Sequence, residues 1–199
     1  NYIGVRWGAL VQNLLMLIKF SALVGVCAVV FIFARGTTAR FISPLPSSFS
    51  PGLVGAFGVG LIAALWALKG WEVATFSAGE LRQPGRNLPL GILIGTAVVV
   101  VLYLGANLAY LYAMPIEAVA RSSRIASDAM HVAIGPVGAA VIALAILFSI
   151  TGATNGHLLT GPRVYFAMAR DGLFFRKVAE VHPRFLTPHF SIVALAGWS

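Results

Sequence analysis

Four long apolar segments dominate this sequence, and they restrict the fold more than any other feature. Each exceeds the ~20 residues with which a helix crosses a hydrocarbon core about 30 Å thick. The segments run over residues 7–34, 52–79, 88–114 and 132–162, and a fifth over 188–199 is truncated. Because lipid gives backbone groups no partner and no alternating barrel pattern is present, the sequence predicts an all-α, polytopic transmembrane helix bundle.

The composition supports a lipid-facing surface. Of 199 residues, 59% are hydrophobic and 10% are charged, whereas soluble domains have roughly 45–50% apolar and about 25% charged residues. This balance excludes a disordered chain and an ordinary cytosolic domain, and the single Cys27 excludes an internal disulfide scaffold. The chain begins at Asn1 and stops inside an apolar stretch, so we expect residues 1–199 to form one partial transmembrane domain.

The charges indicate an orientation. The net charge of +8 would suggest nucleic acid in a soluble protein, but loop charges that hold segments on the cytoplasmic side explain it here, and we expect no nucleic-acid partner. Loops 80–87 and 163–184 lie on the more basic side, which carries Arg6, Arg82, Arg86, Arg163, Arg170, Arg176, Lys177 and Arg184. The other side carries Arg35, Arg40, Arg121 and Arg124. The positive-inside rule therefore predicts that both loops are cytoplasmic in a multi-pass cell-membrane protein.

Lys19 lies near the middle of the first apolar segment. A lysine at the centre of a membrane helix costs roughly 2.5–3.5 kcal/mol on insertion scales, so a carbonyl, hydroxyl or carboxylate must compensate it. The alternative is a lysine that extends its ammonium to the membrane interface. Its central depth favours a functional or site-lining role.

The second segment contains Leu65-Trp66-Ala67-Leu68-Lys69-Gly70-Trp71-Glu72. A glycine weakens a helix interior by about 1 kcal/mol, and transporters use interrupted helices to present backbone groups to a substrate at the midplane. Trp66 and Trp71 would wall such a site. The alternative is a continuous helix in which Lys69 and Glu72 pair at i,i+3.

The fourth segment carries small and hydroxyl residues in Ser149-Ile-Thr-Gly152-Ala-Thr-Asn155-Gly156. Such residues allow close helix packing, and their oxygens can bind an ion or a lysine ammonium. The sequence is consistent both with a packing role and with an ion-binding role for this stretch. The sequence contains no catalytic motif and no metal-ligand spacing, so we expect neither an enzyme, nor a metal, nor a cofactor.

These stretches together resemble an amino-acid permease of the amino acid–polyamine–organocation superfamily, closest to its L-type-like bacterial members. Residues 4–19, from Gly4-Val5-Arg6-Trp7 to Lys19, resemble the fifth helix of the family. Residues 66–72, with Gly79-Glu80 and Pro84-Gly85-Arg86-Asn87-Leu88-Pro89, resemble the sixth helix and its cytoplasmic exit. Residues 152–156, with Gly161-Pro162-Arg163 and Ala169-Arg170-Asp171-Gly172, resemble the eighth.

The resemblance implies a leucine-transporter-like fold built on an inverted repeat of five helices. This chain would hold helices five to eight and the start of nine, and would need the missing helices of the same polypeptide. Substrate would bind at the broken sixth helix, at Trp66, Ala67, Leu68, Lys69, Gly70 and Trp71. Lys19 would occupy the place where sodium-coupled relatives bind sodium, facing Ser149, Gly152 and Asn155.

The resemblance also implies a function. We expect secondary active transport of amino acids by alternating access in the lipid bilayer, coupled to protons or to exchange. This chain has Leu68 and Lys69 where the family often has an aromatic residue and a small or acidic one. The added charge either disfavours cationic substrates or points away from the site. The alternative function is a non-transporting membrane subunit or receptor-like helical scaffold, which would have continuous helices.

Overall fold

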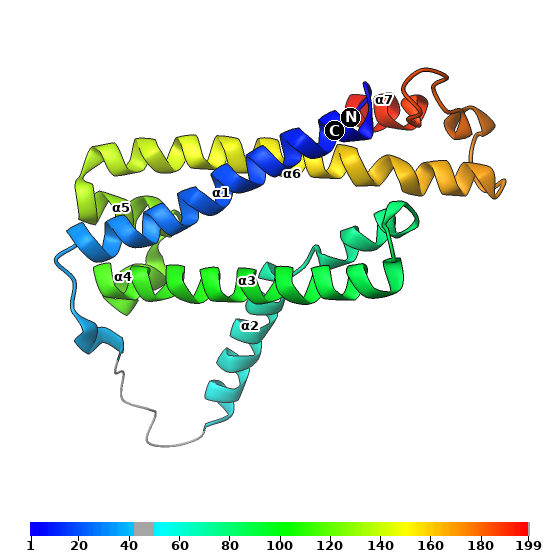
Figure 1. Ribbon diagram of the computed structural model, residues 1–199. Helices are drawn as coiled ribbons and strands as arrows, with labels where there is room; N and C mark the ends of the chain where they lie inside the picture. The colour runs from blue at the N-terminus through cyan, green and yellow to red at the C-terminus, as the bar shows by residue number, and fades with distance from the viewer. Residues whose placement is uncertain (42–49, 199) are drawn as a thin grey trace. The chain divides into compact units, whose positions relative to one another are not determined.

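The computed structural model describes residues 1–41 and 50–198, apart from the side chains of Ser77 and Glu80, and all regular structure in these residues is helical (Figure 1). The elements are α1 (Val5–Phe33), η1 (Thr38–Phe41), α2 (Pro51–Ala67), η2 (Trp71–Glu80), α3 (Pro84–Ala113), α4 (Ile116–Arg121), α5 (Ile125–Ile134), α6 (Pro136–Arg170), η3 (Arg176–Ala179) and α7 (His189–Trp198). The all-α prediction is confirmed.

Within the described residues, four helical segments are long and apolar enough to cross a membrane. They are Val5–Phe33, Pro51–Phe76, Pro84–Ala113 and Pro136–Arg170. The α2 helix has no buried residue although its sequence is wholly non-polar. Exposed apolar surface on this scale is stable only where the surroundings are themselves apolar. The segments therefore have the length and the surface of membrane-spanning helices.

Local chemistry explains where α2 and α6 begin. The Ser50 hydroxyl accepts a hydrogen bond from the Leu53 N–H (3.2 Å), which caps α2. Pro51 and Pro136 take the first positions of their helices, where the missing N–H costs nothing. Gly135, with φ of 69°, separates α5 from α6.

The fourth helix differs from the predicted segment over 132–162. Residues 132–134 end α5, and α6 continues to Arg170, so the first part of the predicted loop 163–184 is helical. Pro162 lies inside α6 and is fully buried. A proline removes one helical hydrogen bond, but neighbouring groups in a membrane helix can compensate the freed carbonyl, so it need not end the helix.

The chain forms two compact units. One comprises residues 23–71 and 92–143, and the other comprises residues 1–22, 72–91 and 144–198. The first unit is centred on a core of alanine, branched aliphatic and methionine side chains that includes Val26, Val30, Ala109, Ala113, Ala129, Met130 and Ile142. In the second unit, the first part of α1 packs on α6, and the Thr187 hydroxyl donates to the carbonyl of Tyr2 (2.9 Å) (Figure 1).

Candidate functional site

The second apolar segment is interrupted. The α2 helix ends at Ala67 and η2 begins at Trp71. The Leu68 N–H donates to the Leu65 carbonyl (3.2 Å) and the Lys69 N–H to the Trp66 carbonyl (3.1 Å), which tightens the last turn. Gly70 then adopts φ of 115°, a conformation that residues with a Cβ rarely adopt. The predicted break is confirmed, and a continuous helix through this segment is excluded.

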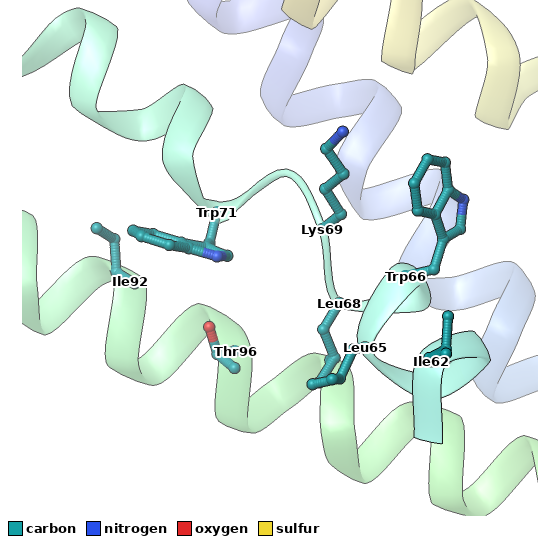
Figure 2. Close-up of a pocket in the computed structure, with 8 residues that line it drawn as sticks. All are labelled: Ile62, Leu65, Trp66, Leu68, Lys69, Trp71, Ile92 and Thr96. Carbon is teal, nitrogen blue, oxygen red and sulfur yellow. The ribbon is translucent and has the colours of Figure 1, made fainter. Parts of the chain in front are cut away.

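A cavity of about 620 Å³ opens beside the break. Figure 2 shows Leu65 and Leu68 directed toward α3, while the Trp71 ring lies beside Ile92. The α2 helix, the turn, Trp71 and α3 supply its lining, which is Ile62, Leu65, Trp66, Leu68, Lys69, Trp71, Ile92 and Thr96. All these residues belong to one compact unit. An apolar cavity with a few polar groups is the usual form of a small-molecule site.

The Lys69 side chain rises from the turn beside the indole of Trp66 (Figure 2). Its ammonium nitrogen lies 4.9 Å from the centroid of the Trp66 ring. A cation within about 6 Å of an aromatic face is attracted by the quadrupole of the ring. Trp66 therefore holds the Lys69 ammonium beside its ring, at the rim of the cavity.

A second group of predicted residues lies where α6 contacts α1. Asn155 donates through Nδ2 to Oε1 of Gln12 (2.8 Å) and to the carbonyl of Gly8 (3.4 Å). Its own side-chain and backbone oxygens accept from Nδ2 of Asn1 (3.2 Å each). Gly152 is buried, and a Cβ placed on it would lie 3.3 Å from Cβ of Leu15. Asn155 and Gly152 thus bind the two helices together.

The register of these contacts indicates which part of α6 lies opposite Lys19. Gly8 lies against Leu159, Gln12 against Asn155 and Gly156, and Leu15 against Gly152, so the two helices run antiparallel. One turn beyond Leu15, the same register brings Lys19 level with residues 148–149, which include Ser149. The side chains of Lys19 and Ser149 are both half-buried. In residues 1–41 and 50–198, the Lys19 ammonium has no hydrogen-bond or carboxylate partner.

Lys19 lies at the middle of α1. It is the central residue of the 29-residue helix α1, which at about 1.5 Å per residue puts its Cα roughly 21 Å from either end. That distance is far beyond the reach of a lysine side chain. The interpretation of Lys19 as a site-lining residue and not an interfacial one stays a prediction.

The family model for amino acid permeases matches residues 1–199. This chain belongs to that family. It is similar to the serine/threonine exchanger SteT of Bacillus subtilis, with 33% identity over 98% of this chain and 45% of that protein. It is also similar to the human b(0,+)-type amino acid transporter 1, with 30% identity over 97% of this chain and 39% of that protein.

A third relative is the mouse large neutral amino acids transporter small subunit 2, with 28% identity over 94% of this chain and 36% of that protein. The permease chain thus spans less than half the length of these curated relatives. The names of the relatives describe transporters and exchangers rather than enzymes. Together with the apolar helices, they make this chain a multi-pass cell-membrane protein.

The structure gathers only some of the permease residues that the sequence singles out. Trp66, Leu68, Lys69 and Trp71 line the cavity, whereas Ala67 and Gly70 contribute backbone to the turn beside it. Lys19, Ser149, Gly152 and Asn155 lie in the other compact unit. The cavity residues that the sequence analysis missed are Ile62, Leu65, Ile92 and Thr96.

Gln12 is a further residue that the prediction left out. Gly8, Gln12, Leu15 and Lys19 are spaced by four, three and four residues, so they share one face of α1. An amide and an ammonium two turns apart on one face of a membrane helix are a signal that could have been read from the sequence.

We expect the Gln12–Asn155 contact to stabilise the permease measurably. Replacing either residue by alanine should lower the free energy of unfolding, and the double variant should show a coupling energy of about 1 kcal/mol. Denaturant titration of the full-length protein in detergent measures all three values. Thr151→Ala is the control, because in the described part of the chain the Thr151 hydroxyl donates to the Leu147 carbonyl of its own helix and to no group of α1. If the double variant loses as much unfolding free energy as the two single variants together, the Gln12–Asn155 pair does not bind the helices together.

Proposed function

We propose that the complete protein moves an amino acid across the membrane by alternating access and binds it at the break between α2 and η2. The observation that carries this proposal is an interrupted membrane helix that opens onto a cavity of about 620 Å³. A non-transporting scaffold has no need of such a break. The proposal also fits the relatives, whose names describe amino acid exchangers and transporters.

The electrostatics of a broken helix suit a zwitterion. The α2 helix ends at Ala67 with carbonyl groups and a partial negative charge, and η2 begins at Trp71 with N–H groups and a partial positive charge. The α-ammonium of an amino acid would bind near the end of α2, and its α-carboxylate near the start of η2. The apolar lining around Trp66, Leu68 and Trp71 would then surround its side chain.

Lys19 and Ser149 form the proposed coupling site. An ammonium in the middle of a membrane helix can take the place of a bound cation and can bind and release a proton. Ser149 lies about one turn before Gly152 on α6, and Gly152 and Asn155 hold that helix against α1. Transport would therefore be coupled to protons or proceed by exchange.

The membrane arrangement completes the proposal. Loops 80–87 and 163–184 would be cytoplasmic, because Lys and Arg are concentrated on that side. The exposed apolar faces of α2 and α3 would contact lipid and further helices of the same polypeptide.

Uptake by the purified full-length protein in proteoliposomes tests the function. We expect a labelled amino acid to accumulate when the vesicles contain an unlabelled amino acid or when a proton gradient is imposed. The whole set of proteinogenic amino acids should be offered in turn. Uptake no greater than that of protein-free vesicles, for every amino acid and under both conditions, would contradict the proposal.

Replacing Lys19 by alanine should remove the coupling. Because the midplane ammonium is lost, we expect uptake to fall by about tenfold or more and its dependence on external pH to disappear. Lys177→Ala, which removes a cation outside the membrane segments, is the matched control and should behave as the unmodified protein does. Full uptake with an unchanged pH profile in Lys19→Ala would rule out the proposed role.

A further inference from the structure

Among the described residues that line the cavity at the break, Lys69 is the only charged one. The remaining lining is apolar except for the hydroxyl of Thr96 and the indole N–H groups of Trp66 and Trp71. An ammonium and an indole only donate hydrogen bonds, and a hydroxyl both donates and accepts. The side chains of the lining therefore offer more donors than acceptors, which suits a substrate side chain that brings acceptors of its own.

The position of the Lys69 ammonium follows from the turn itself. The bond from the Lys69 N–H to the Trp66 carbonyl (3.1 Å) closes the turn that sets the two side chains beside each other (Figure 2). Gly70, at φ of 115°, fixes the direction in which the backbone leaves this turn. The same local geometry that breaks the helix thus places Lys69 among the residues that line the cavity.

The Trp66 ring compensates that charge only in part. The ring contact, 4.9 Å from the ammonium to the ring centroid, is an attraction between a full charge and a quadrupole. A carboxylate offers a full opposite charge and charge-assisted hydrogen bonds, which are stronger. A cationic ligand in the same cavity would face a like charge in surroundings of low polarity, which is unfavourable.

We propose that Lys69 is a specificity-determining residue that favours substrates with a side-chain carboxylate and disfavours cationic ones. This inference rests on the proposed function, because it concerns the side chain of an amino acid bound at the break. The α-carboxylate and α-ammonium are common to all substrates and bind the two helix ends. Lys69 interacts with the side chain of the substrate, which is the part that differs from one amino acid to another.

Competition against the uptake of a transported amino acid tests the inference in the full-length protein. We expect glutamate or aspartate to compete at least about tenfold better than lysine or arginine. Lys69→Gln should bring the acidic and basic competitors to within about threefold of each other, and Lys69→Glu should reverse their order. Lys69→Arg keeps the charge and should keep the original order, and Lys177→Gln controls for charge away from the cavity.

A change in general stability would alter the competition by acidic and basic amino acids alike, so the order of competitors separates specificity from folding. The inference is overturned if lysine competes as well as glutamate in the unmodified protein, or if Lys69→Gln leaves the order unchanged. In either case uptake itself persists, and the proposed function stands. Absence of uptake in the unmodified protein overturns both.

Discussion

Replacing Gly70 by alanine is expected to lower amino acid uptake by about tenfold or more. Gly70 has φ of 115°, and in the described part of the chain no atom beyond the glycine and its two neighbours lies within 4 Å of a Cβ placed on it, so backbone strain and not crowding is the cause. Strain of this kind costs roughly 1–3 kcal/mol, and 1.4 kcal/mol corresponds to about a tenfold change in an equilibrium. The turn would relax and displace Lys69 and Trp71 from the cavity.

Gly60→Ala is the matched control for this experiment. Gly60 lies within α2, has an ordinary helical φ and also has open space around a Cβ. Alanine in that helix should leave uptake within about twofold of the unmodified protein. If Gly70→Ala transports as well as Gly60→Ala does, the conformation of the break is not needed for function.

Replacing Gly152 by leucine should abolish uptake and destabilise the protein. A Cβ at this position already lies 3.3 Å from Cβ of Leu15, so the larger side chain would force α6 away from α1. Overpacking of this kind typically costs about 1–3 kcal/mol and occasionally more. Displacement of α6 would also break the Asn155–Gln12 bond and the alignment of Ser149 with Lys19. Uptake and thermal unfolding in detergent measure both effects.

Two further substitutions test whether the effect of Gly152→Leu depends on close packing at this position. Gly152→Ala adds a methyl group that a shift of a few tenths of an ångström can accommodate, so its effect should be smaller than that of leucine. Ala153→Leu adds bulk at the next position of α6, where the side chain is exposed, and should be tolerated. Equal losses in Gly152→Leu and Ala153→Leu would mean that close packing at Gly152 has no particular role.

The sequence predicted those features that depend on local chemistry. Apolar length was enough to place the long helices, since a chain of this kind must satisfy its backbone groups within each span. The break was predictable because Gly70 and Lys69 lie together inside an apolar run, and the structure confirms it between Ala67 and Trp71. The end of α6 was not predictable. A proline such as Pro162 usually indicates the end of a helix, but α6 continues through it.

The parts of the site that depend on packing between helices could not be predicted. Ile92 and Thr96 line the cavity only because α3 lies beside the end of α2, and nothing in their own sequence indicates it. The Asn155–Gln12 bond likewise depends on the antiparallel register of α1 and α6. The sequence of a helix shows which of its faces is polar. Which residue of a second helix lies opposite a given side chain is decided by how the two helices pack.

Substrate-dependent modification of cysteines at the break tests the central claim most directly. Cys27 would first be replaced by serine, and single cysteines would then be placed at positions 66–72, with Phe57→Cys on the exposed apolar side of α2 as the control. We predict that a membrane-impermeant thiol reagent modifies several of these positions, and that a transported amino acid slows the reaction by about fivefold or more. Uniform protection of positions 66–72, with and without substrate, would contradict the account.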